Sequence, residues 1–249
     1  MANVPFAVNS FLYMNGFELT NDASVSNTTI NIAAGNCRDS TDVYQIITTA
    51  PINVLNTLSG LGGLDTGTVA ASTLYSVYIV ADLLTGLPTS AMISTNMTSP
   101  LMPYSYNSFR KVGYVRTDGS SHFLAGYWYG SNSSRVFMYD APIATAVTAG
   151  AATTFTAVAL TTFVPSVTNL PVWISTAFTP GAASRTLSMT PHGGTGTAVL
   201  ITGQVTSVVV SSNSLILARP NTGAPSIDYL VANSGDAVAI NVAGYQFTI

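Results

Sequence analysis

Charged side chains are scarce in this sequence. Of its 249 residues only 7% are Asp, Glu, Lys or Arg, and 47% are hydrophobic, whereas roughly a quarter of the residues in a typical soluble protein are charged. Disordered chains are rich in charge and poor in aromatic and β-branched residues, so this composition excludes disorder. A surface with so little charge is difficult to keep soluble as a free monomer, because the net charge of -3 gives little self-repulsion. We therefore expect a homo-oligomer or a component of a larger assembly.

Basic residues and long apolar runs are also few. Seven Lys and Arg residues and a pI near 5.0 argue against nucleic acid as a partner, since nucleic-acid-binding proteins carry a basic face. No stretch of about twenty apolar residues is present, so we expect no membrane insertion. The N-terminal residues lack the basic region and the unbroken apolar core of a signal peptide, which predicts synthesis in a cytoplasm.

Cysteine and histidine are nearly absent. The single cysteine, Cys37, excludes an intrachain disulfide, so packing must hold the fold together. Zinc needs three or four clustered ligands, and His122, His192 and Cys37 lack the spacing of a zinc motif. Asp39 and Asp42 share one loop, as calcium ligands often do, but the acidic ladder of an EF-hand is missing. We expect no metal site and no cofactor.

Catalytic groups are equally sparse. Hydrolysis by an activated serine needs a nucleophile elbow with His and Asp partners, and no segment has that pattern. Glycoside hydrolysis needs two carboxyl groups across a cleft, and one Glu with nine Asp is a thin supply. We therefore assign no catalytic residues and expect that the protein is not an enzyme.

Short segments with strand-like alternation cover most of the chain. Runs rich in Val, Ile, Thr, Tyr and Phe are separated by clusters of Gly, Pro, Asn and Asp. In the first half we expect strands at residues 11–19, 28–33, 43–49, 74–81 and 91–94, loops at 34–42 and 59–67, and a short helix or irregular arm at 51–58. In the second half we expect strands near residues 154–164, 170–178, 185–190, 197–210, 214–219, 227–232 and 237–248.

The regular spacing of strands in the second half is typical of a β-sandwich or barrel. The composition of the sequence changes near residues 139–148, after which aromatic residues become rarer. The expected fold class is therefore all-β, with an N-terminal antiparallel β domain at residues 1–140 followed by a C-terminal jelly-roll-like β-sandwich at residues 141–249.

Residues 109–124 are the chemically densest segment. Val112 and Tyr114 suit a half-buried strand, and Asp118-Gly119 is a strong hairpin signal because glycine tolerates the positive φ of a tight turn. We expect the chain to reverse at this dipeptide and to return as a second strand through Phe123 to Tyr129.

Three of the seven basic residues lie in this segment. Alternation along a strand places Arg110 and Arg116 on the face of Val112 and Tyr114, with Lys111 on the opposite face. An arginine in this position usually covers apolar surface with its stem and pairs its head with a carboxylate. The expected partners are Asp65, Asp82, Asp118 and Asp140. A ligand-binding or nucleic-acid-binding patch is the alternative.

Five aromatic residues form two nearby groups, Tyr104 with Tyr106 and Tyr127-Trp128-Tyr129. If the second group is a strand, Tyr127 and Tyr129 share one face and Trp128 takes the other, so at least one face belongs to a core. Aromatic side chains bury large areas and commonly anchor cores and interfaces. We expect either glycan contact or a place in a core or subunit interface for this set.

Four sequence blocks resemble a module of structural proteins from tailed bacteriophages and prophages. The blocks are residues 35–41, 63–67 (Gly-Leu-Asp-Thr-Gly), 75–80 and 110–120, which includes Arg-Thr-Asp-Gly-Ser. The resemblance covers about residues 10 to 140, and residues 242–249 are similar to the closing strand of virion β domains. It implies a protein of the virion surface, made in the cytoplasm of the bacterial host.

The resemblance indicates where the protein is located more clearly than what it does. Three functions therefore stay open. The first is a non-enzymatic homotrimer in the tail fibre or baseplate. It would bind the host receptor, a cell-surface glycan or protein, and contact other virion proteins. The second is a capsid decoration or head-fibre protein. The third is a glycan-degrading enzyme carried on the virion, for which no long solenoid is visible in the sequence.

Overall fold

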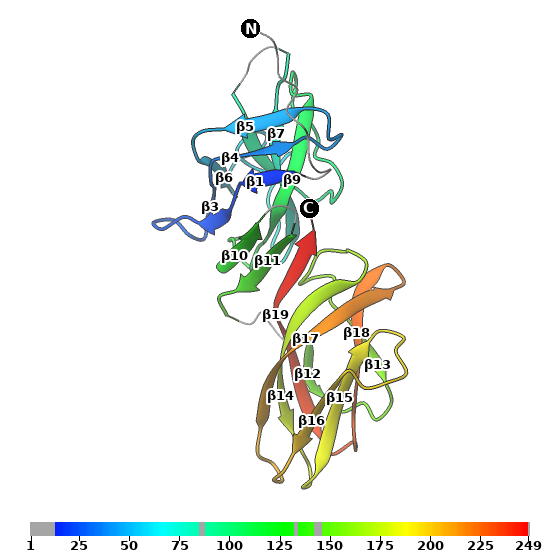
Figure 1. Ribbon diagram of the computed structural model, residues 1–249. Helices are drawn as coiled ribbons and strands as arrows, with labels where there is room; N and C mark the ends of the chain where they lie inside the picture. The colour runs from blue at the N-terminus through cyan, green and yellow to red at the C-terminus, as the bar shows by residue number, and fades with distance from the viewer. Residues whose placement is uncertain (1–12, 85–87, 132–133, 142–145, 249) are drawn as a thin grey trace.

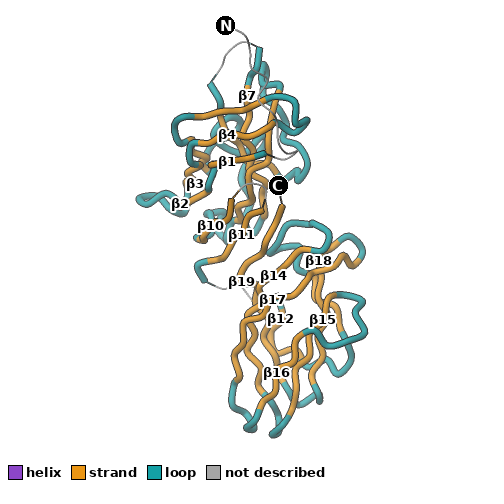
Figure 2. The backbone as a smooth tube through the Cα atoms, in the orientation of Figure 1, coloured by secondary structure: helices purple, strands orange, loops and turns teal. Residues whose placement is uncertain are grey.

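The computed structural model describes residues 13–84, 88–131, 134–141 and 146–248. These residues form an elongated molecule of two lobes that consists of strands and loops (Figures 1 and 2). Nineteen strands and no helix occur within the described ranges. The all-β fold class expected from the sequence is confirmed.

The N-terminal lobe contains three small antiparallel sheets of three strands each. The first has the order β1 (Met14–Gly16), β4 (Gly35–Arg38), β5 (Gln45–Thr48). The second has the order β2 (Leu19–Asn21), β3 (Thr29–Ile32), β6 (Ile52–Leu55). The third has the order β8 (Ser90–Ser94), β7 (Leu74–Ala81), β9 (Ser108–Arg116).

The C-terminal lobe has eight antiparallel strands in two groups. One group has the order β12 (Val147–Gly150), β19 (Ala237–Thr248), β14 (Leu170–Thr179), β17 (Val210–Asn221). The other has the order β13 (Thr156–Ala159), β18 (Ala224–Val231), β15 (Arg185–Pro191), β16 (Val199–Gly203). The end of β17 pairs with β18 and so joins the two groups.

Alternating side chains build the core between these groups. Along β14 every second residue is buried: Leu170, Val172, Ile174, Thr176 and Phe178. The four apolar residues of this set share one cluster with buried residues of β15 and β18, such as Met189 and Ile227. The period of two in the sequence therefore maps directly onto one buried and one outward face.

The last strand reaches from the C-terminal lobe into the N-terminal one. The end of β19 pairs with β11 (Ser134–Tyr139), and β11 pairs with β10 (Gly126–Ser131). Figure 1 shows β10 and β11 beside the tip of β19, next to the N-terminal lobe. The division at residues 140/141 stays a prediction, and one continuous sheet runs across that point.

Buried aromatic rings and Arg135 fill the junction between the lobes. The rings of Phe137, Tyr139 and Tyr245 contact one another, with centroid distances of 4.5 to 6.4 Å. Arg135 donates hydrogen bonds to the carbonyl oxygens of Gly16 and Phe17. Because these contacts join residues more than 100 positions apart, the junction is part of the folded core.

Three segments differ from the expectation. The loop expected at 34–42 contains β4, because Gly35 lies opposite Gly16 and lets two backbones approach; a Cβ at Gly35 would lie 2.7 Å from the oxygen of Asn15. The helix or arm expected at 51–58 contains β6. The strand expected at 197–210 is two strands, since β16 ends at Gly203 and β17 begins at Val210.

The chain reverses at Asp118-Gly119 as expected, but the turn is longer than two residues and the return strand does not continue along β9. The partner of β9 is β7, and the loop after β9 is closed by a single bridge between Thr117 and Phe123. The carboxylate of Asp118 accepts hydrogen bonds from the backbone N–H of Ser120 and His122 and so shapes a longer turn. A positive φ occurs at Ser121, at 64°, and not at Gly119. The Leu124 N–H still donates to the Arg116 carbonyl of β9, and from Gly126 onward the chain pairs with β11.

Candidate functional site

The basic residues of β9 are structural anchors. Arg110 is buried, and its guanidinium lies 3.3 Å from the Asp42 carboxylate, a partner that was not among the four expected aspartates. Arg116 donates from Nε to the carbonyl oxygen of Thr162, and its guanidinium lies 5.3 Å from the Phe163 ring centroid. Among the described residues, Arg116 therefore binds a carbonyl and a ring where a carboxylate was expected.

Lys111 lies on an unexpected face because β9 has a bulge. The register with β7 shifts between Gly113 and Lys111, which inserts Val112 as an extra residue. As a result Lys111 Nζ lies 5.0 Å from the ring centroid of Tyr114, on the same face. The prediction that these two side chains point in opposite directions is wrong.

The five aromatic residues divide between core and surface. Trp128 is buried and donates from Nε1 to the Tyr114 carbonyl, and Tyr106 is buried with its hydroxyl bonded to the Pro88 carbonyl. Tyr127 and Tyr129 are exposed, as is Tyr104, which is 97% exposed. The alternation expected for Tyr127-Trp128-Tyr129 is confirmed. Only the exposed tyrosines can contact a partner.

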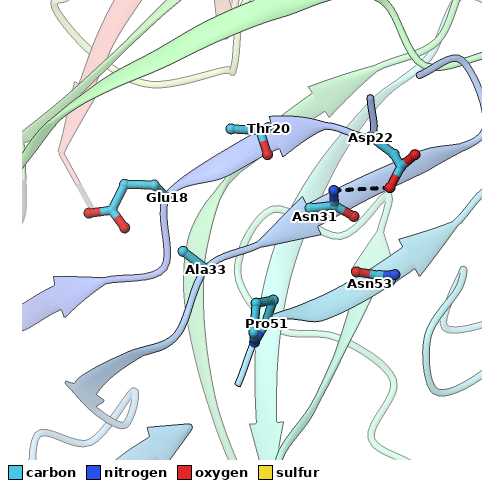
Figure 3. Close-up of a pocket in the computed structure, with 7 residues that line it drawn as sticks. All are labelled: Glu18, Thr20, Asp22, Asn31, Ala33, Pro51 and Asn53. Carbon is cyan, nitrogen blue, oxygen red and sulfur yellow. Dashed lines mark hydrogen bonds between the residues drawn. The ribbon is translucent and has the colours of Figure 1, made fainter. Parts of the chain in front are cut away.

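A polar row crosses the outward face of the β2-β3-β6 sheet. The register places Thr20 opposite Asn31 and Asn31 opposite Asn53. Their neighbours Leu19, Ile30, Ile32 and Val54 point into the core. The row lines a hollow of about 420 Å³, named here the amide hollow, whose lining residues are Glu18, Thr20, Asp22, Asn31, Ala33, Pro51 and Asn53. Figure 3 shows Asn31 near the centre of these side chains.

Asp22 is fixed and ionised at the edge of the amide hollow. Its Oδ1 accepts hydrogen bonds from the N–H groups of Ser24 and Val25, at 2.8 and 3.0 Å. Its Oδ2 accepts one from Asn31 Nδ2 at 3.1 Å, which Figure 3 marks. The bonds from Ser24, Asn31 and Val25 lower the pKa of Asp22 below its usual value. The carboxylate is therefore an acceptor only, held in one orientation.

A second hollow adjoins the first through Thr20. It has a volume of about 290 Å³, is named here the tyrosine hollow, and is lined by Thr20, Asn21, Ala125, Gly126, Tyr127 and Asp140. The hydroxyl of Tyr127 donates to Asp140 Oδ1 at 2.9 Å. This hydrogen bond, together with the charge of Asp140, raises the pKa of Tyr127. The phenol therefore stays protonated.

Sequence reasoning singled out Tyr127 but none of the amide hollow. Asn31 and Asn53 lie in ordinary strands, and only the register of β3 with β6 brings them together. The one available signal was the outward position of each residue between buried apolar neighbours, at Ile30, Asn31 and Ile32 for example.

The remaining candidate chemistry is engaged in the fold. Cys37 is fully buried, and burial raises the pKa of its thiol to about 12. The Asp39 carboxylate accepts hydrogen bonds from Thr41, Val43 and Tyr44. His192 Nδ1 lies 2.7 Å from Asp228 Oδ1. These groups have structural partners or no access to solvent.

A search of the described residues finds no group of three or more His, Cys, Asp or Glu that could hold a metal ion. The same ranges contain no helix with the length and apolar character needed to cross a membrane.

The comparisons with known proteins give no assignment. No family model and no curated protein matches the sequence. One similar solved structure is that of the infectious bursal disease virus Gx strain, at 12% identity and a TM-score of 0.23 over 95% of this chain and 71% of that one. Another is an exo-β-1,3-galactanase from Phanerochaete chrysosporium with galactose, at 12% identity and 0.23 over 94% and 69%. With TM-scores this low, neither structure carries an argument about this chain.

Proposed function

We propose that the protein is a non-enzymatic component of the surface of a tailed-phage virion, in the tail-fibre or baseplate apparatus that binds the host cell. Support comes from the sequence blocks that resemble phage structural proteins and from the surface of the C-terminal lobe. The observation that carries the proposal is how little charge that surface holds.

Four charged residues occur in the C-terminal lobe. Asp228 and Asp236 are buried, and Arg185 lies 3.9 Å from Asp236. Arg219 is then the one exposed charge outside an ion pair in residues 146–248. A free protein normally keeps many exposed charges for solubility, so such a surface fits a subunit that packs against neighbours.

We infer further that the C-terminal sandwich is a jelly roll. Numbered from β12 to β19, its eight strands form one sheet of the first, eighth, third and sixth strands and a second sheet of the second, seventh, fourth and fifth. This order has two interleaved Greek keys, the arrangement of a jelly roll, which occurs in viral capsid and lectin domains.

The outward face of the β19-β14-β17 sheet is the proposed contact between the copies of a homotrimer. Small uncharged residues meet there in rows, such as Asn241 beside Ser175 and Ala239 beside Ala177. Light scattering is expected to give three copies of the 25.8 kDa chain. Ala177→Arg is expected to release monomers, whereas Leu200→Arg, on the exposed side of β16, is expected to leave the trimer intact. A monomeric native protein would contradict the proposal.

Adsorption assays test the receptor-binding function. Purified protein is expected to bind host cells and to compete with phage for adsorption, because it occupies the same receptors. Failure to bind cells and to block infection would contradict this function.

A capsid decoration or head-fibre protein is the second candidate. The described residues form two compact lobes without a fibrous stalk, a shape that also fits docking on a shell. Clearing of host capsule or release of reducing ends by the purified protein would contradict both candidates and favour a glycan-degrading enzyme.

A further inference from the structure

The amide hollow and the tyrosine hollow meet at Thr20, which lines both. Asn21, the next residue, fixes their relative position, because its side chain contacts the start of β10. Its Nδ2 donates to the Leu124 carbonyl at 3.4 Å, and its Oδ1 accepts from the Gly126 N–H at 3.3 Å. We take the two hollows, which share Thr20, together as one groove, named here the Asn31-Tyr127 groove.

The groove offers the two kinds of contact that a sugar ring needs. Asn53 and Thr20 are exposed and supply amide and hydroxyl groups that can both donate and accept hydrogen bonds. Tyr127 is 62% exposed and supplies an aromatic face with a polar tip. Sugars have hydroxyl groups at their edges and apolar C–H groups on their faces, so polar and aromatic surfaces side by side suit them.

One amide acceptor in the groove lacks a partner. Asn31 uses Nδ2 to hold Asp22, while its Oδ1 is buried and has no hydrogen bond within the described chain. Buried polar atoms in folded proteins are nearly always bonded, to protein, water or ligand. The protein alone therefore leaves one amide oxygen of the polar row without a hydrogen bond.

The negative charge of the groove favours uncharged sugars over acidic ones. Glu18, Asp22 and Asp140 line the groove, and neither Lys nor Arg is among its lining residues. These carboxylates repel an anionic ligand, which disfavours uronic acids, sialic acids and phosphorylated sugars. Ionised carboxylates accept strong hydrogen bonds from neutral hydroxyl groups.

We propose that the Asn31-Tyr127 groove binds an uncharged oligosaccharide of the host cell surface. This inference rests on the proposed receptor-binding function and names its ligand class. Asn53 and Thr20 hold the hydroxyl groups, Asp22 orients Asn31, and Tyr127 stacks on the apolar face of one sugar.

Titration calorimetry with neutral glucan, galactan and chitin oligosaccharides tests the proposal, with oligogalacturonate as the acidic comparison. The full chain is expected to bind at least one neutral oligosaccharide and to bind oligogalacturonate at least tenfold more weakly. Asn53→Ala and Tyr127→Ala are each expected to weaken the neutral interaction about tenfold, which corresponds to about 1.4 kcal/mol. Tyr104→Ala, which removes an exposed tyrosine outside the groove, is the matched control and is expected to bind as the wild type does.

Three results would overturn the proposal: no neutral oligosaccharide binds at millimolar concentration, the acidic one binds better, or both groove variants bind within twofold of the wild type. Asn53 and Tyr127 are exposed, and unchanged melting temperatures exclude misfolding as the cause of a loss. If both groove variants still block phage adsorption, the groove is not the receptor site, while the proposed receptor-binding function is supported. If oligosaccharides bind in the groove but the protein never blocks adsorption, the receptor-binding function is contradicted, while sugar binding by the groove is supported.

Discussion

Arg135 on β11 donates a hydrogen bond of 2.6 Å to the backbone carbonyl of Phe17, and both residues are buried. The guanidinium also donates to the carbonyl oxygens of Gly16 and Val112. A charged side chain in the core therefore joins the N-terminal segment, β9 and the sheet that continues into the C-terminal lobe. Its partners are carbonyl groups, which stay in place when the arginine is removed.

Replacement of Arg135 is expected to destabilise the fold strongly. Arg135→Met keeps most of the side-chain volume but leaves buried carbonyl groups without donors, and each such group costs about 1–3 kcal/mol. We expect the free energy of unfolding, measured by urea denaturation, to fall by about 3 kcal/mol. Arg219→Met removes an exposed arginine and is expected to change it by less than about 0.5 kcal/mol. Equal effects of the two substitutions would show that the buried hydrogen bonds do not stabilise the junction.

Substitution by alanine is expected to have opposite effects on stability at two glycines. A Cβ at Gly126 would lie 2.3 Å from the Phe137 ring, so Gly126→Ala is expected to cost about 1–3 kcal/mol by overpacking. A Cβ at Gly119 would meet no atom within 4 Å, and its φ is not positive. Gly119→Ala is expected to be neutral or to stabilise by about 0.4–1 kcal/mol, because alanine restricts the unfolded chain. Thermal unfolding of both variants tests these expectations. A clear destabilisation by Gly119→Ala would instead support a positive φ at Gly119, as in the tight turn expected from the sequence.

We expect the folded protein to lose stability in acid when Asp39 becomes protonated. Burial opposes its ionisation, but hydrogen bonds from Tyr44, Thr41, Val43 and Ser108 outweigh burial and lower its pKa below the ordinary 3.8. Because the pKa is lower in the folded state than in the unfolded one, the stabilisation is fully present above about pH 4 and is lost as the pH falls through the folded value.

The matching variant is Asp39→Asn, which cannot ionise. Urea denaturation at pH 6 is expected to show a lower free energy of unfolding for this variant than for the wild type. The difference is expected to shrink as the pH falls below about 4. A deficit that does not change with pH would mean that the charge of Asp39 has no part in its stabilising effect.

Cys37 is expected to be unreactive in the folded protein. Burial raises the pKa of its thiol to about 12, so neither thiolate nor access is available at pH 8. A colourimetric thiol reagent is expected to label less than one-tenth of the chains in buffer and one thiol per chain in 6 M guanidinium chloride. Rapid labelling of the native protein would contradict the placement of Cys37 in the core.

The local pattern of the sequence predicted strands well and their partners poorly. Residues 74–81 and 237–248 were expected as strands with the bounds that the structure shows, because their apolar residues, turn boundaries and β-branched content agree. The exposed Tyr127 beside the buried Trp128 also followed from strand alternation alone.

The errors come from contacts between distant residues. The pairing of β9 with β7 and the bulge at Val112 depend on neighbours about 30 positions away, which no short pattern encodes. The Asp118-Gly119 signal located the chain reversal but not the turn type, because the carboxylate of Asp118 organises a longer loop. The Asn31-Tyr127 groove needs the register of three strands and the position of β10, so its residues looked ordinary in the sequence.

Localisation in intact particles tests the central proposal most directly. Cryo-electron microscopy of particles of the proposed phage, with gold-labelled antibody raised against the purified chain, is the decisive measurement. Label at the tail fibres or baseplate is the expected result. Label confined to the head shell, or particles without label, would contradict a place in the receptor-binding apparatus.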